Sequence, residues 1–74
     1  MIDINDILST IEQVHTLNEN QAIYVGKPAT TFLKEYVLEH DNDFYETGEV
    51  INTARHIFNH EQGIFFANRY EELR

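Results

Sequence analysis

The sequence predicts an α+β fold that is mostly helical, with three helices and a small two-stranded β ribbon in the order α-β-α-α-β. Apolar residues recur with helical spacing in three segments, and two short stretches of β-branched and aromatic residues are bordered by glycine. Of the 74 residues, 42% are apolar, which favours a packed core over disorder. A chain this short has material for one core, so we expect residues 1–74 to form a single domain.

The N-terminal segment, DINDILSTIEQVHTLN, predicts a helix from about Asp3 to Leu17. Its apolar residues are spaced so that they share one helical face. Asp3 precedes this pattern and is the expected N-cap, and Asp6 in the first turn suits the positive end of the helix dipole. The apolar face consists of Ile4, Ile7, Leu8, Ile11 and Val14.

The middle of the chain predicts one strand and a second helix. The stretch AIYVG, residues 22–26, combines β-branched and aromatic residues with a closing glycine, so we expect a short strand there. Pro28 cannot lie in the middle of a strand and marks the start of a turn or a helix. A second helix is expected from Thr30 to about His40. Its apolar face consists of Phe32, Leu33, Tyr36, Val37 and His40.

The C-terminal part predicts a loop, a third helix and a second strand. The stretch DNDFYETG, residues 41–48, is rich in turn formers and is expected to be a loop. Thr47 is a candidate cap for a helix that Gly63 ends, and residues 64–70, IFFANRY, are expected to be the second strand. A rival interpretation pairs RHIF with IFFA as a hairpin, which leaves residues 49–60 either helix or strand. The helical interpretation rests on Val50, Ile51, Ala54, Ile57 and Phe58.

Two histidines are spaced as metal ligands on a helix can be. His56 and His60 are four residues apart and would share the solvent face of the third helix with Glu49 and Thr53. Two imidazoles at this spacing can bind one divalent ion, as they do on metalloprotease helices. Those helices carry an acid between the histidines, whereas this chain has none there. We therefore expect no metal and no cofactor, and keep a metal-binding protein using His56 and His60 as an alternative.

The charge balance restricts the classes of partner. Thirteen Asp and Glu residues against five Lys and Arg give a net charge of −8 with neutral histidines. A field of this sign opposes direct binding to nucleic acid and favours basic partners. The chain has no cysteine, which excludes disulfides and thiolate metal sites. Without a basic N-terminus or a long apolar stretch, the expected location is the cytoplasm, with no membrane contact.

One stretch of the chain is unusually acidic. No Lys or Arg occurs between Glu35 and Ala54, where Leu38 projects away from the helix's apolar face and Phe44 and Tyr45 lie in the predicted loop. Apolar anchors among acids are typical of a protein-binding surface. The alternatives are a merely solvated acidic surface and aromatic residues that fold back to close the core. The predicted partner-binding residues are Glu35, Leu38, Glu39, Asp41, Asp43, Phe44, Tyr45, Glu46 and Glu49.

The expected function is that of a small non-enzymatic protein-binding module, an inhibitor or regulator of a basic, nucleic-acid-binding protein. Acids that occupy the partner's phosphate sites would make the chain a nucleic-acid mimic. In size, charge and absence of cysteine the chain resembles small acidic proteins of phages and other mobile elements, among them anti-CRISPRs, restriction inhibitors and antitoxins. This resemblance implies a viral protein that acts in the host cytoplasm.

A second hypothesis is a small winged-helix-like DNA-binding regulator. The predicted element order is similar to a helix-turn-helix with a degenerate wing, and Lys27, Lys34, Arg55 and Arg69 would contact DNA despite the overall charge. So few basic residues neutralise few phosphates, which makes this the less favoured function. A homodimer is compatible with every hypothesis because pairing would enlarge a small core.

Overall fold

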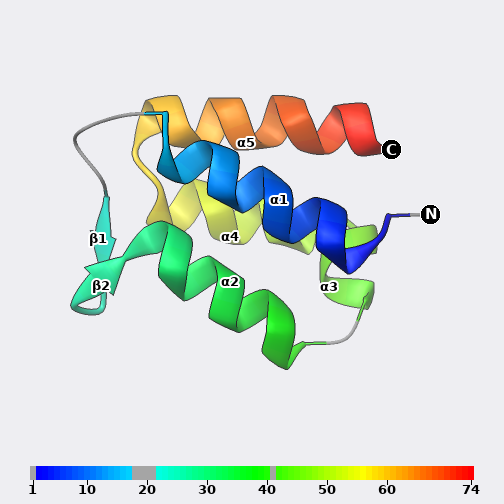
Figure 1. Cartoon of the computed structure of the whole chain (residues 1–74), viewed down its shortest axis with the longest axis horizontal. Coiled ribbons are helices and arrows are strands. Elements are labelled where there is room, and N and C mark those ends of the chain that lie inside the picture. The colour runs from blue at the N-terminus through cyan, green and yellow to red at the C-terminus, as the bar shows by residue number, and fades with distance from the viewer. Residues whose placement is uncertain (1, 18–21, 41) are drawn as a thin grey trace.

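The computed structural model describes residues 2–17, 22–40 and 42–74. These residues form five helices and one two-stranded antiparallel sheet (Figure 1). The predicted class, α+β and mostly helical, is therefore confirmed, whereas the number of helices and the position of one strand were predicted wrongly. The elements are α1 (Ile4–His15), β1 (Ile23–Tyr24), β2 (Lys27–Pro28), α2 (Ala29–Glu39), α3 (Asp43–Glu46), α4 (Glu49–Ile57) and α5 (His60–Leu73).

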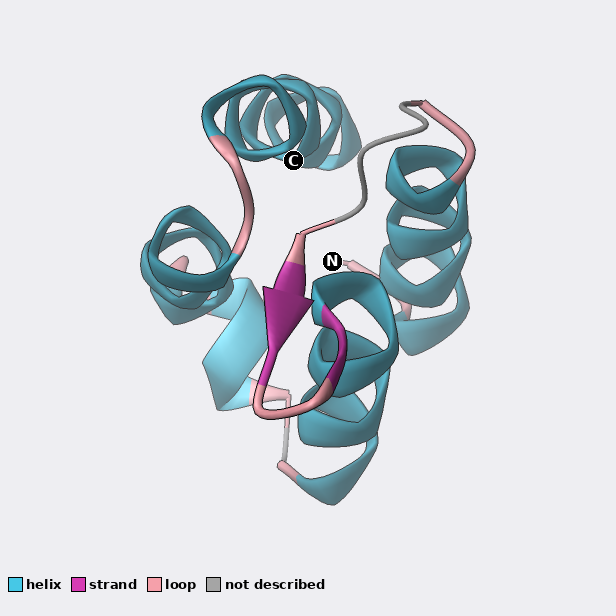
Figure 2. Cartoon of the chain, turned by 90° about the vertical axis from the view of Figure 1, so that its left-hand side faces the viewer, coloured by secondary structure: helices cyan, strands magenta, loops and turns pink. Residues whose placement is uncertain are grey.

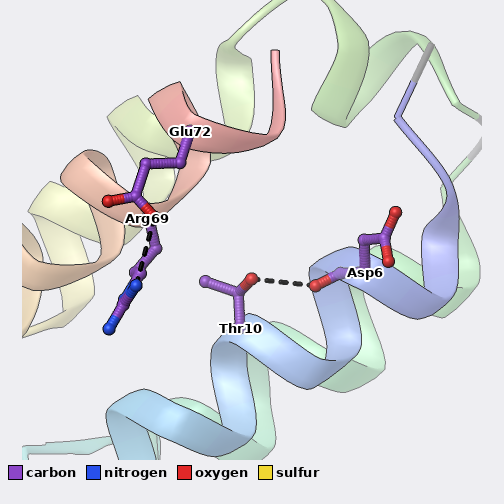
Figure 3. Close-up of polar contacts among 4 residues, drawn as sticks. All are labelled: Asp6, Thr10, Arg69 and Glu72. Carbon is purple, nitrogen blue, oxygen red and sulfur yellow. Dashed lines mark hydrogen bonds and ion pairs between the residues drawn. The ribbon is translucent and has the colours of Figure 1, made fainter.

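Helix α1 forms as its sequence predicts. The side chain of Asp3 accepts a hydrogen bond from the N–H of Asn5 at 2.8 Å, which caps the helix. Inside the helix, the hydroxyl of Thr10 donates to the carbonyl oxygen of Asp6 at 2.8 Å, on the side that Figure 3 shows across from α5. The helix ends at His15, two residues before the predicted end. Its buried residues are Ile7, Thr10, Ile11 and Val14.

The sheet is a hairpin of neighbouring strands. The predicted strand at residues 22–26 is present as β1, but it pairs with β2, which follows at once, and not with residues 64–70. Val25 and Gly26 form the turn between them, and both have positive φ, 54° and 77°. Positive φ at both central residues is the mark of the tight turn that closes two-residue hairpins. Pro28 ends β2 and lies at the N-cap of α2, where its missing N–H is not needed.

The predicted second strand, residues 64–70, is helical. Asn59 starts α5 because its side chain accepts a hydrogen bond from the N–H of Gln62 at 2.8 Å. Gly63 does not end a helix, since it is buried inside α5, where a β-carbon would lie 4.0 Å from the Cα of Arg55. The hairpin of RHIF with IFFA is likewise wrong, because both segments are largely helical. The winged-helix alternative loses the C-terminal strand on which it depended.

Two smaller corrections concern the segment between α2 and α4. The predicted loop contains the one-turn helix α3, and Gly48, with a φ of 92°, precedes α4 in place of the expected cap Thr47. His40 does not belong to the inner face of α2. It follows the helix as its C-cap and is exposed.

The helices pack so that the hairpin and the chain termini lie at opposite ends. Helix α1 contacts α2 and α5, and α4 contacts α5 and α3. Figure 1 shows α3, the start of α1 and the end of α5 at one end of the molecule, and Figure 2 shows the hairpin lying across the other. In the described ranges, no helix is both long enough and apolar enough to cross a membrane. The centre of the core consists of Ile7, Ile11, Val14, Leu33, Val37, Val50, Phe66 and Tyr70.

Candidate protein-binding surface

Acidic side chains collect at the end of the molecule opposite the hairpin. Helices α1 and α4 begin at this end, α2 and α5 finish there, and α3 lies between them (Figure 1). We call this region the acidic end. Its acids are Asp3, Asp6, Glu39, Asp43, Glu46, Glu49, Glu71 and Glu72.

Three of these acids stabilise the helices that carry them. Asp3 caps α1, Asp6 lies in its first turn, and Glu49 lies in the first turn of α4. A carboxylate near the positive end of a helix dipole is favourable by about 0.3–1 kcal/mol. Such acids are explained by local structure and need no partner.

The acids at the C-terminal ends of α2 and α5 are not explained in this way, because a helix dipole disfavours negative charge there. Glu71 is compensated by an ion pair with Arg74 at 3.7 Å. Glu72 is compensated by an ion pair with Arg69 at 3.1 Å (Figure 3). Glu39, in the last turn of α2, has no ion pair with any residue in the described ranges. It is therefore the acid whose position local structure explains least.

Leu38 lies beside Glu39 and is exposed, as predicted. Its exposed fraction is 62%, and it projects from α2 opposite the buried Leu33 and Val37. Glu35, one turn earlier, accepts a hydrogen bond from Lys27 at 2.6 Å. This ion pair joins the outer surface of α2 to the hairpin turn.

The prediction that Phe44 and Tyr45 are exposed anchors is wrong. Their exposed fractions are 5% and 7%, because α3 turns both side chains into the core. The Phe44 ring lies 4.9 Å from the ring of Tyr36 and 5.4 Å from that of His40, measured between centroids. The carbonyl oxygen of Tyr45 accepts a hydrogen bond from the hydroxyl of Tyr70. The structure agrees with the alternative in which these aromatic residues fold back and close a small core.

The remaining predicted acids have different surroundings. Asp43 and Glu49 are exposed at the acidic end, and Asp41 lies outside the described residues. Glu46 is half-buried, and its Oε1 atom is buried without a hydrogen bond. Glu46 is therefore less available to a partner than its neighbours.

The hairpin tip is an exposed apolar feature that sequence reasoning missed. Ile23 and Val25 have exposed fractions of 65% and 71%. Val25 also has a φ of 54°, a left-handed conformation that is strained for a β-branched residue and that Asn, Asp or Gly adopts more easily. The signal in the sequence was the pair Val-Gly at a position where Asn-Gly is the usual turn. Strain of this kind is found at sites kept for function.

We group the exposed residues of the hairpin and of the outer surface of α2 under one name, the α2 face. The ion pair of Lys27 with Glu35 joins the hairpin to the outer surface of α2, whose last turn lies toward the other end of the molecule (Figure 1). The α2 face consists of Ile23, Val25, Glu35, Leu38 and Glu39.

A row of half-buried aromatic rings and two exposed imidazoles runs from the hairpin along α2. The ring of Tyr24 lies 4.8 Å from Phe32 and 6.0 Å from His56, and Phe32 lies 6.0 Å from Tyr36. The imidazole of His40 stacks on Tyr36 at 4.0 Å and an interplanar angle of 13°. Paired rings of this kind contribute about 0.5–1.5 kcal/mol each beyond the area they bury. The row fixes the hairpin and the end of α2 relative to each other.

The expectation that His56 and His60 share a helix is wrong. His56 lies in α4, whereas His60 is the first residue of α5, and the chain turns between them. The histidine spacing on which the metal hypothesis rested is therefore absent. In residues 2–17, 22–40 and 42–74, no three His, Cys, Asp or Glu side chains are grouped so that they could hold a metal ion.

Most of the basic residues considered for DNA contact are already paired. Lys27 pairs with Glu35, Lys34 with Glu12 and Arg69 with Glu72. Arg55 is the exception, since it forms no ion pair with a described residue. Three of these four side chains are therefore already neutralised by acids of the same chain.

No protein-family model, no curated protein and no solved structure matches this chain. The function of the α2 face is therefore inferred from its geometry and charge.

Proposed function

We propose that this protein is a non-enzymatic protein-binding module that binds a basic partner through the α2 face. The observation that carries this proposal is the exposure of Leu38, at 62%, beside the carboxylate of Glu39, which lies in the last turn of α2 and has no ion pair with a described residue.

Both placements work against the stability of the isolated chain. Leu38 keeps apolar surface in water, and Glu39 adds negative charge at the negative end of the α2 dipole. A partner that offers an apolar pocket and a basic side chain relieves both at once. Single exposed leucines are common, so the weight of the proposal lies in this combination.

Apolar anchors and surrounding acids have different roles in such an interface. Buried anchors supply most of the affinity, whereas charges at the rim steer the partner and increase the rate of association. Leu38 and the hairpin tip are the anchors of the α2 face, and the acidic end supplies the steering field. The net charge of −8 supports a basic partner over an acidic one.

The partner class we propose is a nucleic-acid-binding protein, which this chain inhibits or regulates. Proteins of that class carry basic surfaces that attract phosphates, and the carboxylates of the acidic end are suited to the same surfaces. Small acidic proteins of phages and mobile elements, to which this chain is similar in size and charge, support the same proposal.

Affinity capture tests the proposal. The wild-type chain is immobilised, and the proteins it retains from a lysate at low and high salt are identified by mass spectrometry. We expect a basic nucleic-acid-binding protein that is retained at low salt, released at high salt and displaced by duplex DNA. If duplex DNA does not displace the retained protein, nucleic-acid mimicry is excluded, but binding through the α2 face is not.

Two matched variants assign the binding to the α2 face. Leu38→Ser removes the exposed leucine of that face, and Ile64→Ser removes an exposed apolar side chain of similar size from α5. We expect Leu38→Ser to lose the captured protein and Ile64→Ser to retain it. Equal retention by both variants, or no specific protein at either salt concentration, would contradict the proposal.

A further inference from the structure

A groove lies between the end of α4 and the first half of α5. Its volume is about 590 Å³, within the range of about 300–1,000 Å³ that small-molecule sites occupy. The groove is separate from the α2 face and shares no residue with it. Its lining consists of Arg55, Phe58, Asn59, His60, Gly63, Ile64, Ala67 and Asn68.

The charge of this groove is opposite to that of the chain as a whole. None of the lining residues is acidic, although the chain has thirteen Asp and Glu residues. Arg55 lines the groove and forms no ion pair with the described residues. The other four Lys and Arg side chains, Lys27, Lys34, Arg69 and Arg74, are all in ion pairs. Among the Lys and Arg side chains, the one without an ion pair to a described residue thus lies in the groove.

Part of the groove wall is apolar. Ile64 has an exposed fraction of 49%, and it lies with Ala67 and the largely buried ring of Phe58 along the same hollow. Because Gly63 has no side chain, α5 can lie close to the backbone of Arg55. The groove therefore combines the cationic side chain of Arg55 with an apolar wall, and the amide of Asn68 is part of the same lining.

We propose that this groove binds a small amphipathic carboxylate, a monoanion with an apolar body of about six to ten carbon atoms. A guanidinium group binds a carboxylate through two parallel hydrogen bonds, and the apolar wall accepts the body of the ligand. A single Arg neutralises a single negative charge. A phosphate monoester, which carries nearly two, would remain partly uncompensated in a chain of net charge −8. The volume of the groove matches a small ligand better than a folded protein.

Titration with octanoate, followed by the chemical shifts of the backbone amides, tests the proposal. Two related probes separate its parts: 1-octanol has the apolar body without the charge, and acetate has the charge without the body. We expect octanoate to shift the amides of residues 55–68 in a saturable manner and to bind at least about tenfold more tightly than either probe. Equal binding of 1-octanol, or no saturable shift with octanoate, would overturn the proposal.

Arg55→Gln removes the cation and retains a polar side chain of similar reach. Because Arg55 is exposed and has no ion pair with a described residue, we expect the variant to fold, with an unfolding midpoint lowered only by the loss of a cation from the last turn of α4. Its octanoate affinity should fall about tenfold, to that of 1-octanol. Arg69→Gln is the matched control, since Arg69 lies on α5 and is not among the lining residues of the groove, and should bind octanoate like the wild type. Unchanged binding by Arg55→Gln would contradict the assignment.

A second copy of the chain is the other occupant that the same experiment detects. Groove shifts that depend on protein concentration in the absence of octanoate would show self-association through Ile64 and would overturn the ligand proposal. Leu38→Ser separates this inference from the proposed function, because it alters the α2 face and should leave octanoate binding unchanged.

Discussion

The hydroxyl of Tyr70 donates a hydrogen bond to the backbone carbonyl oxygen of Tyr45 and so joins the last helix to the one-turn helix α3. Tyr70 is completely buried, and its ring stacks near Phe66 at a centroid distance of 6.5 Å. This contact holds in place the segment that sequence reasoning interpreted as an exposed loop.

Tyr70→Phe tests the importance of this contact. The substitution keeps the ring and leaves the buried carbonyl oxygen of Tyr45 without its partner, which costs about 1–3 kcal/mol. We expect the free energy of unfolding in urea to fall by that amount. Tyr24→Phe, at a half-buried ring on the hairpin, is the control, and its free energy of unfolding should fall by less. Equal losses in the two variants would contradict a special role for Tyr70.

The same tyrosine predicts a loss of stability at alkaline pH. Burial raises the pKa of Tyr70 above its ordinary value of 10.0, Glu71 and Glu46 raise it further, and Arg74 and the N–H of Gly48 oppose the shift. The folded state thus favours the neutral phenol. This contribution to stability is complete below pH 10.0 and is lost as the pH rises through the folded-state pKa.

We therefore expect the unfolding free energy of the wild type to fall more steeply above about pH 10 than that of Tyr70→Phe. Urea titrations at a series of pH values between neutral and strongly alkaline measure the two slopes. Parallel curves would show that Tyr70 does not titrate with unfolding.

Glu39 and Glu49 occupy opposite positions in the helix dipoles and predict opposite effects of one substitution. Glu39→Gln removes a carboxylate from the C-terminal turn of α2 and should stabilise the fold by about 0.3–1 kcal/mol, whereas Glu49→Gln removes one from the first turn of α4 and should destabilise it by a similar amount. Thermal unfolding at low salt measures both. A destabilised Glu39→Gln variant would mean that this carboxylate has a structural partner.

The buried side chain of Gln62 predicts a stabilising substitution. Gln62 is completely buried, and neither its Oε1 nor its Nε2 atom has a hydrogen-bond partner. Gln62→Met keeps the length of the side chain, removes the unpaired amide and leaves the backbone bond to Asn59 intact. We expect the free energy of unfolding of Gln62→Met to exceed that of the wild type by about 1–3 kcal/mol. A less stable variant would show that the amide is bonded in solution, for example to a buried water molecule.

The predictable part of the fold is the part governed by local patterns. Helix α1 was predicted to within two residues because Asp3 caps it and its apolar residues repeat at helical spacing. The inner face of α4 was predicted for the same reason. Gly63 misled the prediction because a glycine that ends a helix and one that lets two helices approach look alike in the sequence. With Gly63 taken as a stop, the aromatic residues after it suggested a strand.

The candidate surface was less predictable because exposure depends on distant contacts. Leu38 was placed correctly, since helical spacing alone turns it away from the core. Phe44 and Tyr45 were misplaced because their burial depends on Tyr70, which is 25 residues away from Tyr45, and on the way α3 folds back onto the end of α2. The tip at Val25 was missed because its exposure follows from a hairpin between neighbouring strands, where a longer-range pairing was predicted.

Val25 predicts a gain of stability on substitution. Asn tolerates the left-handed conformation that Val25 adopts with strain, so Val25→Asn should stabilise the chain by about 1 kcal/mol. Thermal unfolding measures the change. A less stable variant would show that the side chain of Val25 makes a contact that outweighs the strain.

The most direct test of the central claim measures the stability and the partner affinity of one double variant, Val25→Asn with Glu39→Gln. Both substitutions remove features of the α2 face that work against the isolated fold. If these features are kept for binding, the double variant is more stable than the wild type and binds the captured partner more weakly. A variant that is more stable and binds with unchanged affinity would contradict the claim that the α2 face is the binding surface.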